Sequence, residues 1–293
     1  MKNKLFSVLF MCSALLLSGC GGEDSDNVGG GSDNTSALDV ATQDRKNLLS
    51  LIQKKNHTQE DITAIEEFDT SNINDMSNLF AHSLLDIDLS QWKTEQVINM
   101  EGMFYGAVWF NQDLSGWDVS NVLSMKNMFV GAKDFNQDLS GWDVSNVIDD
   151  SSMLSDTRIQ VVHLPNTKNK AFYEALIEKD YDVVANYDVS LMTSMAAIFY
   201  GASAFNQDIS EWNTGNVTDM SMMFNGASAF NQDISKWNTG NVTNMSTMFS
   251  FASTFNQDIS TWNVGRVVEH RNFSLGTNLV FIQNKQPKFK AFN

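Results

Sequence analysis

The feature that most constrains this chain is a unit of 25 residues that recurs along most of its length. Tryptophans stand 25 residues apart in two groups, at Trp92, Trp117 and Trp142 and again at Trp212, Trp237 and Trp262. The segment Phe-Asn-Gln-Asp recurs in the same register, beginning at Phe110, Phe135, Phe205, Phe230 and Phe255. Such a repeat predicts stacked coils, because one short unit cannot bury its apolar side chains alone.

Each group gains one weaker unit at its start, where Phe68 and Tyr187 replace the tryptophan, so each holds four coils. The interval from Trp142 to Tyr187 is 45 residues, longer than one period. It could be a loop inserted into one continuous solenoid. We favour a duplicated, capped module, because the coils after Trp142 and Trp262 lose the same core methionine, to Asp150 and His270.

A helical stretch is predicted before each group of coils. Apolar residues recur at helical spacing in both stretches, which are Leu48, Leu49, Leu51 and Ile52 and then Phe172, Tyr173, Leu176 and Ile177. Terminal units of repeat proteins differ from the internal ones because they cover an open end. We therefore expect a first array over residues 38–166 and a second array over residues 167–293, each folding alone.

Within one coil, the side chains that follow each tryptophan fall at positions i, i+3, i+4 and i+7, as Met220, Met223, Phe224 and Ala227 do. This spacing predicts a short helix. The preceding segment Asp-Ile-Ser-x-Trp-Asn predicts a short strand that stacks into a parallel ladder. The expected fold is an α/β repeat solenoid, similar to leucine-rich repeats, with short parallel strands and short helices in two capped arrays.

Asparagine and aspartate also recur in the coils. Asn206, Asn231 and Asn256 predict a stacked amide ladder that satisfies backbone groups of turns. The alternative is a row of calcium ligands at Asp113, Asp138, Asp208, Asp233 and Asp258. The amide ladder is favoured, because calcium loops collect several oxygen ligands and a bending glycine, whereas each coil offers a single aspartate.

The first twenty residues predict an export signal. Lys2 and Lys4 precede an apolar stretch, residues 5–17, which runs into Leu17-Ser18-Gly19-Cys20. This end resembles a bacterial lipobox, and the alternative is an ordinary secretory signal with a chance cysteine. We expect a signal peptide over residues 1–19, lipidation at Cys20 and a flexible tether over residues 20–37. The expected location is the cell envelope, at the outer membrane or cell surface, with the membrane reached only through the lipid.

Composition excludes several functional classes. The chain has 19 basic and 35 acidic residues, a net charge of −16, which argues against binding nucleic acid. It has only 2 cysteines and 4 histidines, on no shared motif, so a zinc site is not expected. No glycine-rich phosphate loop follows a strand, and no nucleophile elbow is present. We expect a protein that is not an enzyme and that needs no cofactor or metal.

The full unit, Phe-Asn-Gln-Asp-Ile-Ser-x-Trp-Asn-Thr-x-Asn-Val-Thr-x-Met-Ser-x-Met-Phe, resembles the repeat of BspA-like leucine-rich-repeat surface proteins. Similar repeats are abundant in mycoplasma surface lipoproteins. The resemblance covers residues 40–290 and weakens in the coils at 142–166 and 262–293. It implies a secreted or lipid-anchored protein involved in adhesion to host matrix proteins or in contact between bacteria. It implies no catalytic residue.

The function expected from these features is recognition or adhesion at the bacterial surface, with an unknown protein or glycan partner from host matrix or another bacterial surface. The alternatives are a structural envelope or cell-contact protein without a soluble ligand, and a calcium- or glycan-binding module. Binding assays, self-association assays and calcium titration distinguish these functions.

The residue before each tryptophan supplies the candidate binding surface, because its chemistry changes from coil to coil. It is Gln91, Gly116, Gly141, Glu211, Lys236 and Thr261 in chain order. A position that accepts both Glu and Lys cannot be buried, since an unpaired buried charge is costly. We therefore expect Glu211, Lys236 and Thr261, with Gln91 in the first array, to face a partner. The second choice is an exposed row on the expected helices, Tyr200, Asn225 and Ser250.

Overall fold

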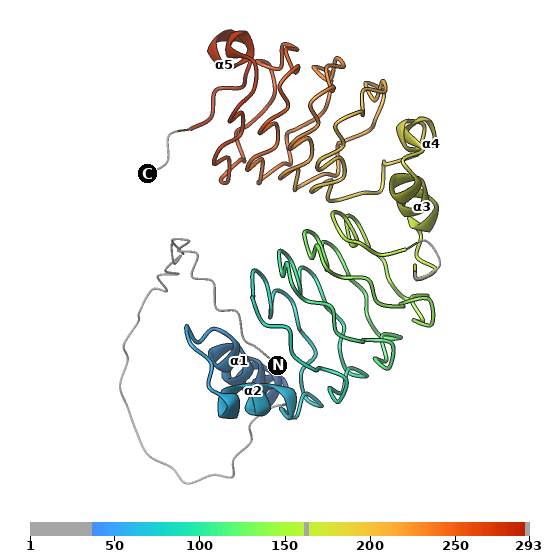
Figure 1. Cartoon of the computed structure of the whole chain (residues 1–293), viewed down its shortest axis with the longest axis vertical. Coiled ribbons are helices and arrows are strands. Elements are labelled where there is room, and N and C mark those ends of the chain that lie inside the picture. The colour runs from blue at the N-terminus through green and yellow to red at the C-terminus, as the bar shows by residue number, and fades with distance from the viewer. Residues whose placement is uncertain (1–36, 161–163, 291–293) are drawn as a thin grey trace, which may run out of the picture. The chain divides into compact units, whose positions relative to one another are not determined.

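The computed structural model describes residues 37–160 and 164–290, all within the second of two compact units, Met1–Thr35 and Ser36–Asn293. The helices of the described residues are α1 (Ala37–Ile52), α2 (Gln59–Glu66), α3 (Lys170–Glu178), α4 (Tyr181–Ala185) and α5 (Leu279–Asn284). In Figure 1, α1 and α2 precede the first group of coils, α3 and α4 stand between the groups, and α5 follows the second group.

The helical stretches predicted before each group of coils are confirmed. α1 buries Leu48 and Ile52, and α3 buries Phe172 and Tyr173, against the core of the coils. α2 begins at a capping box, in which the Thr58 hydroxyl accepts from the Asp61 N–H and the Asp61 carboxylate accepts from the Thr58 N–H. The paired bonds satisfy two backbone donors that have no partner inside the helix.

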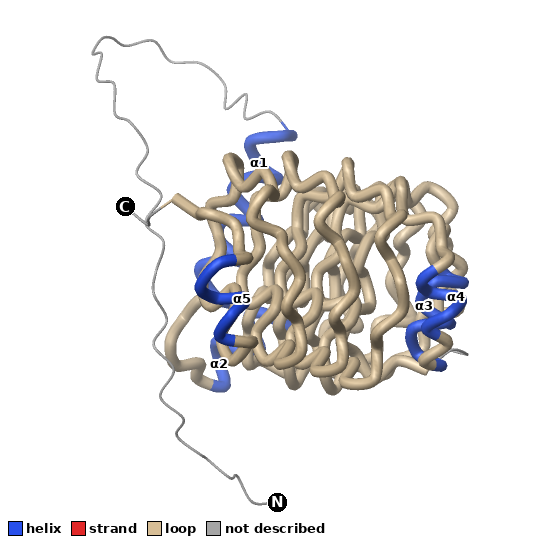
Figure 2. Tube along the Cα trace, turned by 90° about the horizontal axis from the view of Figure 1, so that it is seen from above, coloured by secondary structure: helices blue, strands red, loops and turns tan. Residues whose placement is uncertain are grey.

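The predicted α/β solenoid is wrong. No strand occurs in residues 37–160 or 164–290, and helices are confined to the segments that flank the coils. Figure 2 shows the stacked coils as loops and turns throughout. Neither the expected strand at Asp-Ile-Ser-x-Trp-Asn nor the expected helix after it forms, so the similarity to leucine-rich-repeat architecture does not hold.

Two left-handed residues in every coil prevent the expected helix. The first holds φ between 54° and 60°, at Asn78, Gly102, Asn127, Ser152, Ala197, Met222, Thr247 and Asn272. The second, four residues later, holds φ between 58° and 76°, at His82, Gly106, Gly131, Asp156, Gly201, Gly226, Phe251 and Gly276. A right-handed helix cannot contain such residues. The segment is therefore two successive turns, and glycine recurs at the second position because it adopts this conformation without strain.

These turns carry the backbone bonds that join the coils. In the second array, alternate N–H groups donate to carbonyls of the next coil at 2.8–2.9 Å, from Met220 to Asn244, Met222 to Ser246, Phe224 to Met248 and Gly226 to Ser250. Isolated parallel bridges link the same coils just before the first methionine, as between Asp219 and Asn244. The ladder between coils thus runs through the segment where a helix was expected.

Side chains at the predicted core positions are buried, although the helix is absent. Met220, Met223, Phe224 and Ala227 are all fully buried. Aromatic rings of successive coils stack in rows, and the tryptophans at 212, 237 and 262 lie 6.3 and 6.2 Å apart between ring centroids with nearly parallel planes. Offset stacking of this kind adds to the apolar area that each coil buries against its neighbours.

The tryptophan at the centre of each coil also makes a bond that phenylalanine could not make. The Trp237 indole N–H donates to the Ile209 carbonyl of the preceding coil at 3.0 Å, and Trp262 donates to Ile234 at 3.1 Å. The first coil of each array has no preceding coil in its array. This explains why Phe68 and Tyr187 stand at the tryptophan position there.

Helices cover the open ends of the stack. In α1, Arg45 donates to the carbonyls of Asp75 and Ser77, at 2.9 and 2.6 Å, on the outer edge of the first coil. In α3, the Tyr173 hydroxyl donates to the Asp150 carbonyl and accepts from the Met153 N–H in the last coil of the first array. These bonds satisfy backbone groups that have no neighbouring coil to pair with.

Candidate recognition surfaces

The amide ladder predicted from the asparagines is confirmed. The Asn231 N–H donates to the Asn206 side-chain oxygen at 2.8 Å, and the Asn256 N–H donates to Asn231 in the same way at 2.9 Å. The following glutamine adds a second bond, since the Gln232 amide donates to the Asn206 carbonyl at 2.8 Å. The Phe-Asn-Gln segment therefore joins adjacent coils by hydrogen bonds, and these bonds are a structural reason for its repetition.

The aspartates proposed as calcium ligands close turns instead. Oδ1 of Asp208, Asp233 and Asp258 accepts the N–H of the serine two residues later at 2.9–3.0 Å. The bonds from Ser210 and Ser235 hold the pKa values of Asp208 and Asp233 below their ordinary value. Within residues 37–160 and 164–290, no group of three or more His, Cys, Asp or Glu side chains could hold a metal ion.

The predicted binding row lies on the surface. Gln91, Glu211, Lys236 and Thr261 are all exposed, each beside a buried tryptophan. The glycines at the same position of the first array, Gly116 and Gly141, have open space where a side chain would stand. The fold therefore permits any side chain at this position.

The second predicted row is wrong as an exposed helical surface. Ser250 is 0% exposed, and its hydroxyl donates to the Asn272 carbonyl at 2.6 Å. Tyr200 is half-buried, and its hydroxyl accepts a hydrogen bond from the Lys133 ammonium at 3.2 Å. Asn225 is also only partly exposed. The row fails because the segment is a pair of turns, which point these positions toward other coils.

An exposed apolar row in the first array was missed by the sequence argument. Ile98, Leu123 and Ile148 hold the same position in successive coils and are 46%, 43% and 69% exposed. Their backbones are joined, since Leu123 donates to Ile98 and Ile148 donates to Leu123 at 2.9 and 2.8 Å. The second array carries Thr193, Thr218 and Thr243 at this position in its first three coils, and an exposed apolar residue, Val268, in its fourth. Comparison of the two arrays could have found the row.

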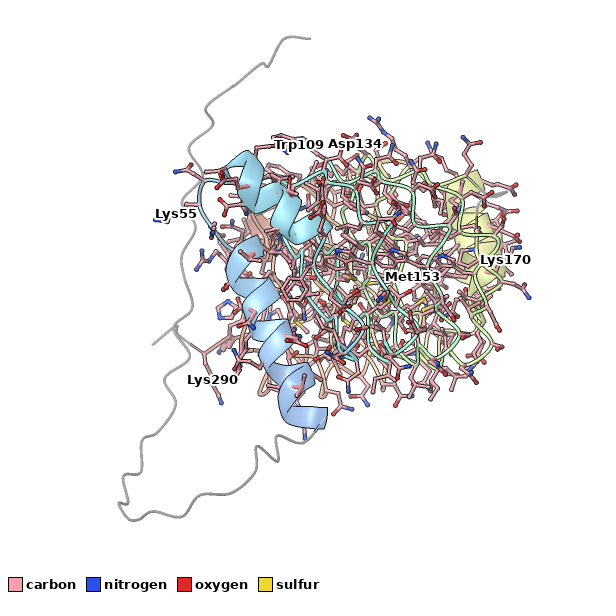
Figure 3. The ribbon with its side chains drawn as sticks, turned by 90° about the horizontal axis from the view of Figure 1, so that it is seen from below. Lys55, Trp109, Asp134, Met153, Lys170 and Lys290 are labelled. Atoms are coloured by element: carbon pink, nitrogen blue, oxygen red, sulfur yellow. The ribbon has the colours of Figure 1, made fainter. Side chains whose placement is uncertain are left out.

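A further exposed side chain stands at another edge of the first array. Trp109 is 55% exposed and precedes the buried Phe110, and Asp134 holds the same position in the next coil. Figure 3 shows Trp109 and Asp134 close together at one edge of the stack, and the Asp134 N–H donates to the Val108 carbonyl at 3.0 Å.

The turns of the two arrays face each other across a polar cleft of about 520 Å³, here called the inter-array cleft. Its lining includes Asn78, His82, Glu101 and Tyr105 of the first array and Asn244 and Ser246 of the second. The sequence did not identify them as a site, because the residue types at these positions change from coil to coil.

Direct bonds between the arrays lie beside the inter-array cleft. The Asn127 amide donates to Oδ2 of Asp219 at 3.2 Å, and the Lys126 ammonium donates to the Thr218 hydroxyl at 2.9 Å. The Ser221 N–H donates to Oδ1 of Asp219 at 2.9 Å. Burial raises the pKa of Asp219, and these hydrogen bonds oppose the rise.

Two aromatic side chains stand at the first-array side of the inter-array cleft. The Tyr105 hydroxyl lies 3.3 Å from the Ser221 hydroxyl, and burial raises the pKa of Tyr105 to about 12. The His82 ring packs edge-to-face on Tyr105, with 5.3 Å between centroids. Burial lowers the pKa of His82, so its imidazole is neutral at physiological pH.

The predicted lipidation site, Cys20, and the predicted signal peptide and tether lie outside the described residues. None of the helices in the described part of the chain is long and apolar enough to cross a membrane.

One family model matches the chain, and it matches twice, over residues 46–164 and 166–284. Its description is "Mycoplasma protein of unknown function, DUF285". No curated protein and no solved structure matches the chain. The matches agree with the mycoplasma side of the expected resemblance, and they contain nothing that concerns BspA-like proteins.

Proposed function

The chain belongs to the DUF285 family, and we propose that it is a surface recognition protein that binds a macromolecular partner through exposed side chains of its coils. The resemblance to BspA-like adhesins supports this proposal. In it the protein is not an enzyme and needs no cofactor, and the partner is a protein or glycan of the host matrix or of a bacterial surface.

The observation that carries the proposal is that repeating side chains and the varying side chains before each tryptophan have different environments within each coil. Side chains that repeat are buried or bonded to the next coil, as Trp237 and Asn231 are. At the position before each tryptophan the side chain varies and is exposed, as at Glu211, Lys236 and Thr261. A constant scaffold with a variable exposed row is the arrangement by which repeat proteins present binding surfaces.

The apolar row Ile98, Leu123 and Ile148 gives the proposal a second support. The matching coils of the second array fold with Thr218 and Thr243 where the first array has Ile98 and Leu123, so folding does not require large apolar side chains in those two coils. Exposed apolar side chains on adjacent coils remain in contact with water unless a partner covers them, and contiguous exposed apolar surface often marks an interaction site.

A binding experiment tests the proposal. The detergent-solubilised full chain is used to capture proteins and glycans from host and bacterial extracts, and each captured candidate is purified and titrated. We expect saturable binding to one candidate. The triple variant Glu211→Ala, Lys236→Ala, Thr261→Ala should weaken it while leaving the melting temperature nearly unchanged. Self-association without any saturable partner would favour a structural envelope or cell-contact protein.

A matched set of variants tests the apolar row separately. The double variant Ile98→Thr, Leu123→Thr gives two coils of the first array the residues that the matching coils of the second array carry, Thr218 and Thr243, so folding should be retained. We expect weaker binding of the same purified partner. Unchanged affinity for both variant sets, with intact folding, would place the binding surface elsewhere on the protein.

Anchoring is proposed through Cys20, because that residue completes the lipobox-like segment. Metabolic labelling with a palmitate analogue should mark the wild-type protein and leave Cys20→Ser unlabelled as a precursor of higher mass. Equal labelling of both proteins would show that lipid is attached elsewhere, and the proposed location at the cell envelope would then need another anchor.

A further inference from the structure

The inter-array cleft has a lining that suits a neutral, hydroxyl-rich molecule. The lining combines apolar surface with amide and hydroxyl side chains, including Asn78, Asn244, Ser246 and Thr247. Burying these groups against an apolar ligand would leave hydrogen bonds unmade, at a cost in affinity. The volume, about 520 Å³, lies within the range of pockets that hold small ligands.

The charged groups at the cleft are already paired within the protein. Both oxygens of Asp219 accept hydrogen bonds, from Ser221 and from Asn127. The Lys126 ammonium donates to Thr218 and lies 3.9 Å from the Glu101 carboxylate. An anionic ligand would find no uncommitted cation among these groups, and a cationic ligand would compete with Lys126 for Glu101. The pairing favours an uncharged ligand.

Two further observations point to a ligand. Asn127 is only 7% exposed, and its side-chain oxygen has no hydrogen-bond partner among the described residues. Asn127 lines the cleft, so this buried acceptor lies beside it. His82 packs edge-to-face against Tyr105 but keeps part of its surface exposed, so it places an aromatic ring at the cleft. A sugar ring presents C–H groups on its face and hydroxyls around its edge, so it can contact a ring and bond amides at once.

We propose that the inter-array cleft binds a neutral oligosaccharide. Asn78, Asn244 and Ser246 bond its hydroxyl groups, and the His82 ring packs against one sugar face. The cleft is separate from the exposed rows assigned above to a macromolecular partner, so either site can fail without the other.

The repeat itself supplies variants that remove the cleft side chains while respecting the backbone. Asn78 and His82 hold φ of 56° and 58°, and the next coil carries Gly102 and Gly106 at the same two positions. The double variant Asn78→Gly, His82→Gly therefore keeps residues that this conformation accepts. Its melting temperature is measured first, and it should stay close to that of the wild type.

Calorimetric titration of the detergent-solubilised full chain tests the proposal. The probes are lactose, maltotriose, cellotriose and chitotriose, with sialyllactose as the anionic probe and trilysine as the cationic probe. We expect saturable binding of at least one neutral probe and none of the charged probes. The Asn78→Gly, His82→Gly variant should bind that probe about tenfold or more weakly, because it loses hydrogen bonds and the ring contact.

The matched control is the triple alanine variant at Glu211, Lys236 and Thr261, which should bind the neutral probe with wild-type affinity. The proposal is overturned if no neutral probe binds, if the folded double-glycine variant binds as well as the wild type, or if sialyllactose or trilysine binds instead. Loss of neutral-probe binding in the triple alanine variant would also overturn it, by moving the site to the exposed row.

Discussion

At the scale of single residues, the contact between Asn127 and Asp219 holds a partly buried charge between the arrays. The Asp219 carboxylate accepts from the Asn127 amide, while the Asn127 side-chain oxygen has no partner among the residues that the structure describes. In the next coil, Asn244 stands at the position of Asp219 and accepts the Ser246 N–H at 2.9 Å, the same turn that Asp219 makes with Ser221. The fold therefore accepts asparagine at this position.

Replacing Asp219 with Asn should stabilise the protein at neutral pH. The new amide can donate to Oδ1 of Asn127 once that side chain flips, so the hydrogen bond between the two residues is kept and the cost of burying the charge is removed. We expect the free energy of unfolding to rise by roughly 1 kcal/mol at pH 7, measured by chemical denaturation. A decrease would show that attraction between Asp219 and Lys126 outweighs the cost of burying the carboxylate.

The gain in stability from Asp219→Asn should grow as the pH rises. The pKa of Asp219 is raised above its ordinary value of 3.8 by burial, so the native state binds its proton more tightly than the unfolded state. Stability from this group is present below pH 3.8 and is lost as pH rises through the native pKa. The stabilising effect of Asp219→Asn should therefore be larger at pH 7 than below pH 4.

The indole bond of the tryptophans gives a second residue-scale prediction. Trp237→Phe keeps an aromatic ring in the stack and removes the donor to the Ile209 carbonyl. We expect a loss of about 0.5–1.5 kcal/mol, because the Ile209 carbonyl keeps only the Trp212 N–H of its two donors. The control is Tyr187→Phe, where the hydroxyl donates to Lys168 at 3.3 Å on an exposed edge and its loss should cost much less. Equal losses would mean that ring size, rather than the bond, selects tryptophan.

At the scale of elements, the sequence predicted burial better than it predicted local structure. The spacing of Met220, Met223, Phe224 and Ala227 identified core residues correctly, because two successive turns of about four residues place the same side chains inward as a helix does. The helix itself was wrong. The signal that could have excluded it is the glycine that recurs one residue before the alanine, as at Gly226, since a recurring glycine indicates a left-handed residue.

The two candidate sites also differ in whether the sequence could predict them. The exposed row at Glu211, Lys236 and Thr261 could be predicted, because variation between coils reveals which positions tolerate charge. The inter-array cleft could not be predicted. Its contacts join residues such as Asn127 and Asp219, which lie far apart in sequence and whose residue types are not kept from coil to coil. Nothing in the sequence of one coil indicates which other coil it will face.

The cap formed by α1 gives a prediction at this scale. Arg45→Met keeps the apolar stem of the side chain and removes the donors to the Asp75 and Ser77 carbonyls. We expect a loss of about 1.5–3 kcal/mol and faster amide hydrogen exchange in the first coil, since bonds from a charged donor are lost. Lys46→Met, an exposed change on the same helix, is the control and should cost less than about 0.5 kcal/mol. Matching losses would assign α1 a packing role only.

At the scale of the whole described unit, one apolar core runs through the coils of both arrays, from Leu48 to Phe281. α3 belongs to both sides of the junction. Its Tyr173 bonds the last coil of the first array, whereas its Phe172 packs on Tyr187 and Trp212 of the second. The cut expected from the sequence, between residues 166 and 167, therefore leaves this shared helix with the second array.

Three fragments test whether the arrays are independent modules. Residues 167–293 keep α3 and α5, so this fragment should melt cooperatively alone. Residues 38–166 lack Tyr173, so the Asp150 carbonyl and the Met153 N–H keep only the hydrogen bond between them and lose their bonds to the Tyr173 hydroxyl. This fragment should melt at a lower temperature than residues 38–180, which restore α3, as followed by circular dichroism and calorimetry. Tyr173→Phe within 38–180 should remove most of that gain if the hydroxyl is responsible. If neither 167–293 nor 38–180 folds while the full chain does, the eight coils form one continuous cooperative unit. The sequence would then be a duplication whose two halves do not fold independently.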